Sequence, residues 1–234
     1  MADNLRSFMV SCKGGLDTGR DLLSQGDVKP GSAIALINYE PALTGGYRRI
    51  SGFTNSYGTV SGTGPILGVA VANGINEGIL SCRNPVAGNN YLHYWDGAAW
   101  QAVTTAGAPT MAGVSKVRFT SFNFGTPKVM LTDGGNPAAA YDGTTYTQIS
   151  HTAAPSSPRL SVEFQNHIML AGDPTEDTNV YFSAPYSDTD FAVANGAGVI
   201  NVGFPVVAMK PFRDALYIFG TNNIRKLTGT DASN

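Results

Sequence analysis

Charged residues are scarce in this chain of 234 residues, because Asp, Glu, Lys and Arg together make only 14% of the sequence. An ordinary soluble domain carries about 25%. The formal net charge is −2, and the cations are scattered except for two adjacent pairs, Arg48 with Arg49 and Arg225 with Lys226. This balance argues against a basic nucleic-acid-binding face, and we expect the uncharged polar surface to contact other proteins.

Cysteine, long apolar runs and helical periodicity are also sparse. The two cysteines, Cys12 and Cys82, lie in different segments, which indicates free buried thiols rather than a disulfide framework. No run reaches the ~18 apolar residues of a membrane span, and no basic start precedes an apolar core, so we expect neither membrane insertion nor a secretion signal. One short stretch, 18–25, has the pattern of a helix of a turn or two.

Motifs that carry catalysis or bind a metal are missing. The three histidines, His93, His151 and His167, are widely spaced and do not form an HExxH arrangement. The sequence also has no GxSxG elbow and no Gly-Lys-Ser/Thr phosphate cradle. The sequence therefore predicts no catalytic residue, no metal site and no cofactor.

The densest acidic region is DPTEDTN at 173–179. Its spacing fits no recognisable calcium loop, so a solvated hairpin loop is the better interpretation. Asp173 and Glu176 are the only candidates, and poor ones, for the carboxylate pair of a sialidase-type glycoside hydrolase. That enzyme class stays open as a second alternative.

The chain contains a repeated turn signature. YWDGAAW at 94–100 and YDGTTY at 141–146 place Asp96 with Gly97 and Asp142 with Gly143 at equivalent positions. Asp and Gly tolerate the backbone angles of a tight hairpin, so each signature predicts a strand, a turn and a second strand. We interpret each as the outer hairpin of a repeated unit.

A second repeat supports the first. An apolar strand, a polar turn and another apolar strand recur around Phe122, Phe164 and Phe212, and the segment 66–83 fits the same pattern more loosely. A period of about 40–50 residues is typical of propeller blades with about four short strands each. The sequence thus predicts an all-β, propeller-like array of about four blades of short antiparallel strands. No closing segment is evident, so the array is either incomplete or closed by the strand near 33–39, by a continuation beyond Asn234 or by a neighbouring chain.

The expected domain organisation follows from these repeats. We expect an extended N-terminal segment with leading strands over 1–53 and blades over 54–234. The predicted blades cover residues 60–105, 113–151, 157–200 and 203–234.

The N-terminal segment has its own strand pattern. The dense apolar run 33–39 predicts a strand buried on both faces, which Pro41 ends. Gly45 and Gly46 then predict a turn into a second strand that contains Arg48 and Arg49. Adjacent residues on a strand point to opposite faces, so we expect these two arginines to form separate solvated or intersubunit salt bridges.

Several of these segments also resemble a known family. The Gly-Gly-Leu stretch at 14–16, the Pro-Gly-x-Ala turn at 30–33 and GGYRRI at 45–50 are similar to the opening of tailed-bacteriophage structural proteins of the tail-nozzle or tail-tubular type, and FRDALYIFGTNNIRKLTG at 212–229 resembles one of their blades. The resemblance implies a virion protein of the phage tail, assembled in the host cytoplasm, that forms a homo-oligomeric, hexameric ring. Its implied partners are the portal or adaptor and other tail proteins, and genomic DNA would pass through the ring during ejection.

Another role for the same architecture stays open. Four aromatic residues near the turns, Trp95, Trp100, Tyr141 and Tyr146, could pack between blades or stack on sugars. In the second case the protein would be a carbohydrate- or receptor-binding propeller of the phage tail.

Overall fold

The computed structural model describes residues 14–17, 31–33, 35–42, 45–52, 56–76, 78–84, 91–103 and 116–229. They belong to two compact units, Met1–Ser56 and Tyr57–Asn234. The described elements are β-strands apart from one short 3-10 helix, η1 at Val193–Asn195. The all-β prediction is therefore confirmed. No helix in the described part of the chain is long and apolar enough to cross a membrane.

The first unit contains a two-stranded hairpin. Strand β1 (Tyr39–Pro41) pairs antiparallel with β2 (Tyr47–Arg49), and Gly45 and Gly46 adopt φ angles of 90° and 84° in the turn. Such positive angles suit glycine because it has no Cβ. The predicted turn is therefore present.

The prediction of a strand over 33–39 is wrong, because β1 begins only at Tyr39. Ile37 is 80% exposed, and Asn38 adopts φ 60°, which interrupts the extended run. A two-stranded hairpin offers no second sheet to bury both faces. Ala33 instead forms an isolated bridge to Leu16. The helix predicted over 18–25 lies outside the described residues.

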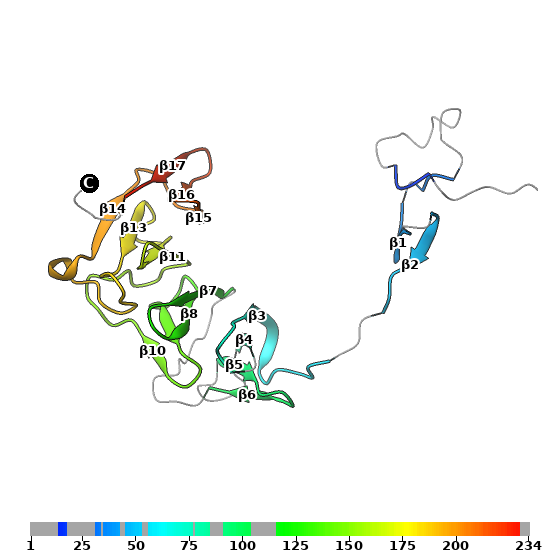
Figure 1. Ribbon diagram of the computed structural model, residues 1–234, viewed down its shortest axis with the longest axis horizontal. Helices are drawn as coiled ribbons and strands as arrows, with labels where there is room; N and C mark the ends of the chain where they lie inside the picture. The colour runs from blue at the N-terminus through cyan, green and yellow to red at the C-terminus, as the bar shows by residue number, and fades with distance from the viewer. Residues whose placement is uncertain are drawn as a thin grey trace, which may run out of the picture. The chain divides into compact units, whose positions relative to one another are not determined.

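The second unit consists of four consecutive antiparallel sheets, which we call blades 1 to 4 (Figure 1). Blade 1 comprises β3 (Thr63–Val71), β4 (Ile79–Asn84), β5 (Leu92–Trp95) and β6 (Trp100–Ala102). Blade 2 comprises β7 (Arg118–Asn123), β8 (Pro127–Thr132), β9 (Ala139–Tyr141) and β10 (Tyr146–Gln148). Blade 3 comprises β11 (Leu160–Phe164), β12 (His167–Ala171), β13 (Asn179–Phe182) and β14 (Gly198–Asn201). Blade 4 has three described strands, β15 (Ala208–Phe212), β16 (Ala215–Phe219) and β17 (Ile224–Leu227).

The blades follow one another in an open arc (Figure 1). The first strand of each blade contacts the first strand of the next, from β3 to β7, β11 and β15. The outer hairpins of blades 1 and 2 contain the Asp-Gly turns, as predicted. Phe164 and Phe212 are the last residues of their first strands, and Phe122 is the last but one of β7. The propeller-like array is therefore present, and it does not close into a ring.

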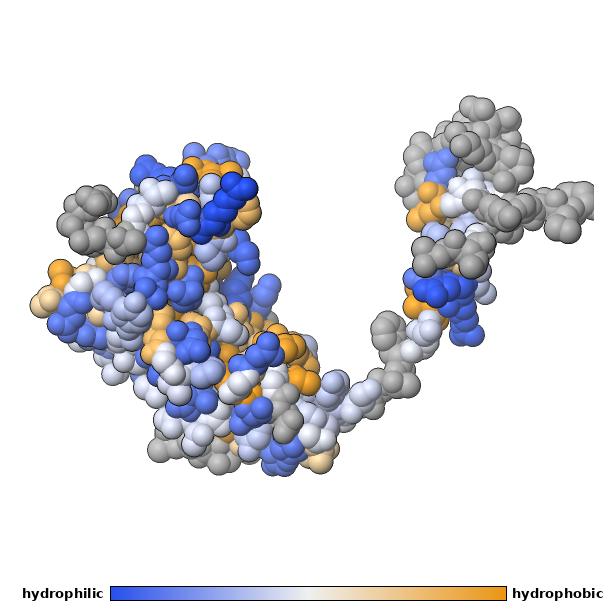
Figure 2. All heavy atoms as spheres, in the orientation of Figure 1, coloured by the Kyte–Doolittle hydropathy of each residue, from blue (hydrophilic) through white to orange (hydrophobic). Residues whose placement is uncertain are grey.

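Three apolar clusters hold neighbouring blades together. The cluster between blades 1 and 2 contains Leu80, Cys82 and Tyr146. The cluster between blades 2 and 3 is built around Met130, Ile168 and Phe122, and the cluster between blades 3 and 4 joins Phe164 and Phe182 to Leu216 and Ile218. The surface in view is largely polar, with apolar patches between polar side chains (Figure 2).

Candidate functional site: the inner strands and the turns

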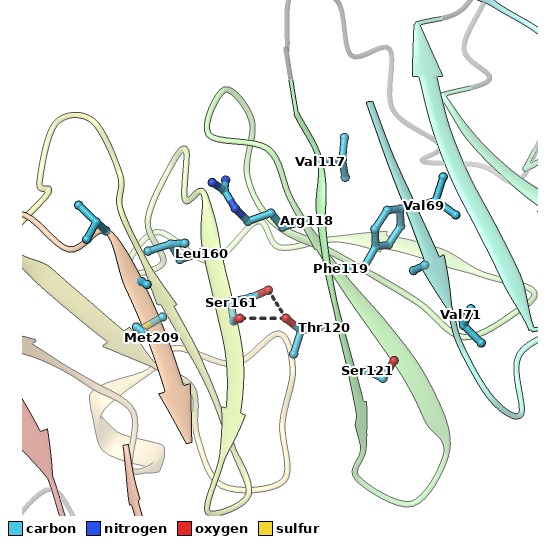
Figure 3. Close-up of a pocket in the computed structure, with 13 residues that line it drawn as sticks. Val69, Val71, Val117, Arg118, Phe119, Thr120, Ser121, Leu160, Ser161 and Met209 are labelled. Atoms are coloured by element: carbon cyan, nitrogen blue, oxygen red, sulfur yellow. Dashed lines mark hydrogen bonds between the residues drawn. The ribbon is translucent and has the colours of Figure 1, made fainter. Parts of the chain in front are cut away.

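The first strands of the blades line a hollow of about 580 Å³ (Figure 3). Its walls include Val69 of β3, Phe119 of β7 and Met209 of β15. Thr120 Oγ1 lies 2.8 Å from both the carbonyl oxygen and the Oγ of Ser161, which joins β7 to β11. A hollow of this size holds a small molecule and is far too small for duplex DNA.

Arg118 is the only charged residue among the described residues that line this hollow. Its guanidinium Nη1 donates a hydrogen bond to the carbonyl oxygen of Arg159, at 3.0 Å. Arg118 therefore links blade 2 to blade 3. The described residues of the lining include no acidic side chain.

The two Asp-Gly turns have the same geometry. Asp96 Oδ1 accepts hydrogen bonds from the Ala98 and Ala99 amides at 2.8 and 2.7 Å, and Gly97 adopts φ 97°. The hydrogen bonds from Ala99, Ala98 and Gln101 lower the pKa of the Asp96 carboxyl. This carboxylate is therefore used to hold the turn.

The equivalent turn of blade 2 repeats these contacts. Asp142 Oδ1 accepts from the amides of Thr144 and Thr145 at 2.8 and 2.7 Å, and Gly143 adopts φ 98°. Burial raises the pKa of Asp142, but the hydrogen bonds from Thr145 and Thr144 outweigh it and hold the pKa below its usual value. These contacts match the prediction that Asp96 and Asp142 form hairpin turns.

The aromatic residues beside the turns divide into two groups. Tyr141 and Tyr146 are 1% and 2% exposed and pack between blades 1 and 2. A sugar ring needs an accessible aromatic face. The interpretation of Tyr141 and Tyr146 as stacking candidates is therefore wrong, and both are core residues.

Trp95 and Trp100 are partly buried and lie edge to face, with ring centroids 5.7 Å apart. Tyr57, which the sequence did not single out, adds a second edge-to-face contact with Trp95 at 5.2 Å and is 46% exposed. No local signal identifies Tyr57, because it lies far from Trp95 in sequence. The accessible aromatic group is therefore Tyr57, Trp95 and Trp100.

The acidic segment 173–179 forms a tight loop in blade 3. Asp173 is 2% exposed and accepts hydrogen bonds from the Thr175 amide and hydroxyl, the Ser157 amide and the Ser156 hydroxyl. Burial raises the pKa of Asp173, but these hydrogen bonds outweigh it, and the net effect lowers that pKa. The expectation of a solvated loop is wrong for Asp173.

Glu176, the other hydrolase candidate, is also engaged. Its Oε2 accepts hydrogen bonds from the Tyr181 hydroxyl and from Asn179 Nδ2, and these lower the pKa of Glu176. Both candidate carboxylates therefore stabilise the loop, and the described residues contain no group of three side chains that could hold a metal ion.

The arginine pair of the first unit lies on β2. Arg48 Nε donates to Glu40 Oε1 across the hairpin at 2.6 Å, and both side chains are exposed. Arg49 lies opposite Tyr39 in the same register. Arg48 thus has an ion-pair partner in its own chain, and an exposed pair of this kind contributes little to stability.

His93, His167 and Cys82 are buried. Cys82 is fully buried, and burial, followed by the nearby charge of Asp133, raises its pKa. His93 is 1% exposed, and burial lowers its pKa. His167 Nδ1 lies 2.6 Å from the Ser183 carbonyl. Cys12 lies outside the described residues.

Comparison of the sequence with protein-family models and with curated proteins finds no match to either.

Proposed function

We propose that this protein is a structural, non-enzymatic component of a bacteriophage tail, whose copies form a hexameric ring around the channel through which DNA leaves the particle. The observation that carries the proposal is that four carboxylates hold turns and loops in place. Asp96, Asp142, Asp173 and Glu176 each hold a turn or loop through two or more hydrogen bonds. Such a set of acidic residues is typical of a scaffold rather than a catalyst.

The low charge and the open arc support an assembled state. Only 14% of residues are charged, and a propeller that does not close leaves strand edges and apolar faces that natural proteins cover. The hollow of blades 1 to 4 is too small for duplex, so the proposed channel lies between copies. A closed ring of identical subunits gives such a channel through a head-to-tail interface.

Cryo-electron microscopy of the intact particle, with subunit identification, tests this function. We expect the chain in a closed ring on the tail axis, around a channel that admits duplex DNA. A single, peripheral copy away from the axis would contradict the proposal.

The second candidate function is glycan or receptor binding on the same particle. Tyr57 favours it, because an exposed aromatic beside Trp95 and Trp100 resembles the stacking surfaces that bind sugars. Glycan-array binding that Tyr57→Ala abolishes, while the circular dichroism spectrum is unchanged, would support this role. Absence of binding by the wild-type protein across the array would contradict it.

A further inference from the structure

The face of blade 1 that points away from blade 2 contains two buried polar side chains. Leu80, Cys82 and Leu92 face blade 2 in the shared apolar cluster. Because side chains alternate along a strand, Ser81 and His93 lie on the opposite face, directly across from each other in the β4–β5 ladder. We call them the buried pair, because each is only 1% exposed.

The segment 57–62, which leads into β3, is attached to this same face, and we call it the strap. At its start, the ring of Tyr57 contacts Trp95 edge to face, with ring centroids 5.2 Å apart. Further along, the Val60 carbonyl accepts a hydrogen bond from Arg83 Nη1 at 2.5 Å. The strap therefore has one attachment at Trp95 and another at Arg83.

The two attachments lie on either side of the buried pair. Trp95 follows His93 by two residues on β5, and Arg83 follows Ser81 by two residues on β4, so all four side chains share one face. Because β4 and β5 are antiparallel, Trp95 and Arg83 lie at opposite ends of this face, with the buried pair between them. The strap runs from one end to the other and thus crosses over Ser81 and His93.

The buried pair lacks hydrogen-bond partners. Among the described residues, no group of ordinary hydrogen-bond geometry meets the Ser81 hydroxyl or either ring nitrogen of His93. Burial lowers the pKa of His93, a backbone contact with Tyr91 partly opposes this, and the positive charge of Arg83 lowers the pKa further. A neutral ring fits under the strap, whereas an imidazolium would bury a charge and two N–H donors without acceptors.

No carboxylate lies in the elements packed around His93. The strap, β3 and β6 contain no charged residue, and Tyr57 is their only titratable side chain. Strand β4 contributes the Arg83 cation on the same face, whereas the Cys82 thiol points toward blade 2. On β5 itself, Tyr94 alternates with His93 and faces away from the strap. Protonation of His93 would place two positive charges together, with no described carboxylate to balance them.

We propose that the strap is a pH-sensitive cover, which protonation of His93 releases from blade 1 so that the buried pair and Trp95 become accessible. An uncovered histidine has a pKa of about 6.5, whereas the covered ring resists protonation. The closed form is therefore fully favoured above about pH 6.5, and the open form gains up to about tenfold for each pH unit below it. This inference concerns blade 1 alone and is independent of the proposed tail function.

The two tryptophans of the chain report on the strap, because Trp95 contacts Tyr57 and Trp100 contacts Trp95. Acrylamide quenching of tryptophan fluorescence in the full chain, measured from about pH 7.5 to about pH 4.5, tests the proposal. We expect the quenching constant to rise about twofold or more toward the acid end, with an unchanged far-UV circular dichroism spectrum. The ring protons of His93, followed by NMR, should titrate with the same midpoint.

Three variants of the full chain complete the test. His93→Gln, which cannot be protonated, should keep the quenching constant flat with pH. His151→Gln is the matched control, because His151 lies outside blade 1, after β10, and this variant should keep the wild-type rise. Val60→Ala leaves the Tyr57–Trp95 contact in place but weakens the closed form about tenfold. It should therefore move the midpoint upward by about one pH unit.

Four results would overturn the proposal. The first is a quenching constant that does not change with pH in either the wild type or Val60→Ala. The second is an equal rise in His93→Gln, because another group would then release the strap. The third is a loss of circular dichroism signal that parallels the rise, because the blade itself would then unfold. The fourth needs no variant, and it is a His93 ring that titrates more than about one pH unit away from the quenching midpoint.

Discussion

Asp173 is a buried carboxylate that joins two segments of blade 3. It accepts hydrogen bonds from Ser156 and Ser157 on one side and from Thr175 on the other. Because these bonds favour the ionised form, the folded pKa lies below the usual value of about 3.9. The stabilisation is complete above that usual pKa and is lost as the pH falls through the lowered folded pKa.

We therefore expect the free energy of unfolding of the wild-type protein to fall as the pH drops below about 4 and through the lowered folded pKa of Asp173. Asp173→Asn should lower it by about 1–3 kcal/mol at pH 7, because the amide group cannot accept at both positions. The variant should also show a shallower loss in acid. Urea unfolding at several pH values measures both effects.

Asp177→Asn is the matched control. It makes the same change of charge in the same loop, and no side-chain hydrogen bond of Asp177 is present among the described residues. It should leave the stability at pH 7 within about 0.5 kcal/mol of the wild type. Equal losses in the two variants would mean that net charge, not the hydrogen bonds of Asp173, sets the stability.

A second prediction depends on the single side chain of Cys82. It is 0% exposed between blades 1 and 2, and burial raises the pKa of its thiol. Because the thiolate is the reactive form, Cys82 in a Cys12→Ser variant should resist a thiol reagent in the native protein and react promptly in urea. Rapid reaction under native conditions would show that the first two blades separate readily.

Phe164 and Phe212 test how the blades depend on one another. They lie at equivalent ends of β11 and β15, but Phe164 is 5% exposed between blades 3 and 4, whereas Phe212 is 60% exposed. Phe164→Ala should therefore lower the free energy of unfolding by about 3–5 kcal/mol. Phe212→Ala should lower it by less than about 1 kcal/mol.

Urea unfolding of both variants and the wild type measures the difference. Phe212 contacts the ring of Tyr217 and the guanidinium of Arg213, so a small loss is expected. A loss for Phe212→Ala that matches the loss for Phe164→Ala would contradict the exposure of Phe212 and show that Phe212 is buried in solution.

Gly68 marks a close approach between two inner strands. A Cβ at this position would lie 2.5 Å from the Val117 carbonyl oxygen, which belongs to the segment leading into β7. Gly68→Ala should destabilise the protein by about 1–3 kcal/mol because β3 must move away from that backbone. Gly52→Ala is the control, since no atom lies within 4 Å of its added Cβ. Thermal unfolding that does not separate the two variants would contradict the close approach.

The sequence predicted the features that local residues determine. Asp96 with Gly97 and Asp142 with Gly143 specify their turns through contacts two and three residues away, and the period of the repeats specifies the blades. The burial of Asp173 and the contact of Tyr57 with Trp95 depend on segments far apart in the chain. The run 33–39 has strand composition, but the described part of its own unit contains only the β1–β2 hairpin and no second sheet to cover it.

Among the residues that the structure describes, the apolar core lies in the blades. Every residue of the three clusters lies between Leu67 and Leu227, and the first unit contributes none of them. Since burial of apolar surface is the dominant favourable contribution to folding, the blades should hold their structure without residues 1–56.

A chain of residues 57–234 tests this independence. It keeps Tyr57 and also Val60, whose carbonyl accepts a hydrogen bond from Arg83 Nη1 at 2.5 Å. We expect its unfolding midpoint to lie within about 2 °C of that of the full chain, because about 1 kcal/mol shifts the midpoint of a protein of this size by about 2–4 °C. Differential scanning calorimetry of both chains makes the comparison. A midpoint more than about 6 °C lower would show that the first unit supplies stability to the blades. Residues 1–56, rather than another molecule, would then be the first candidate for what covers the blade edges.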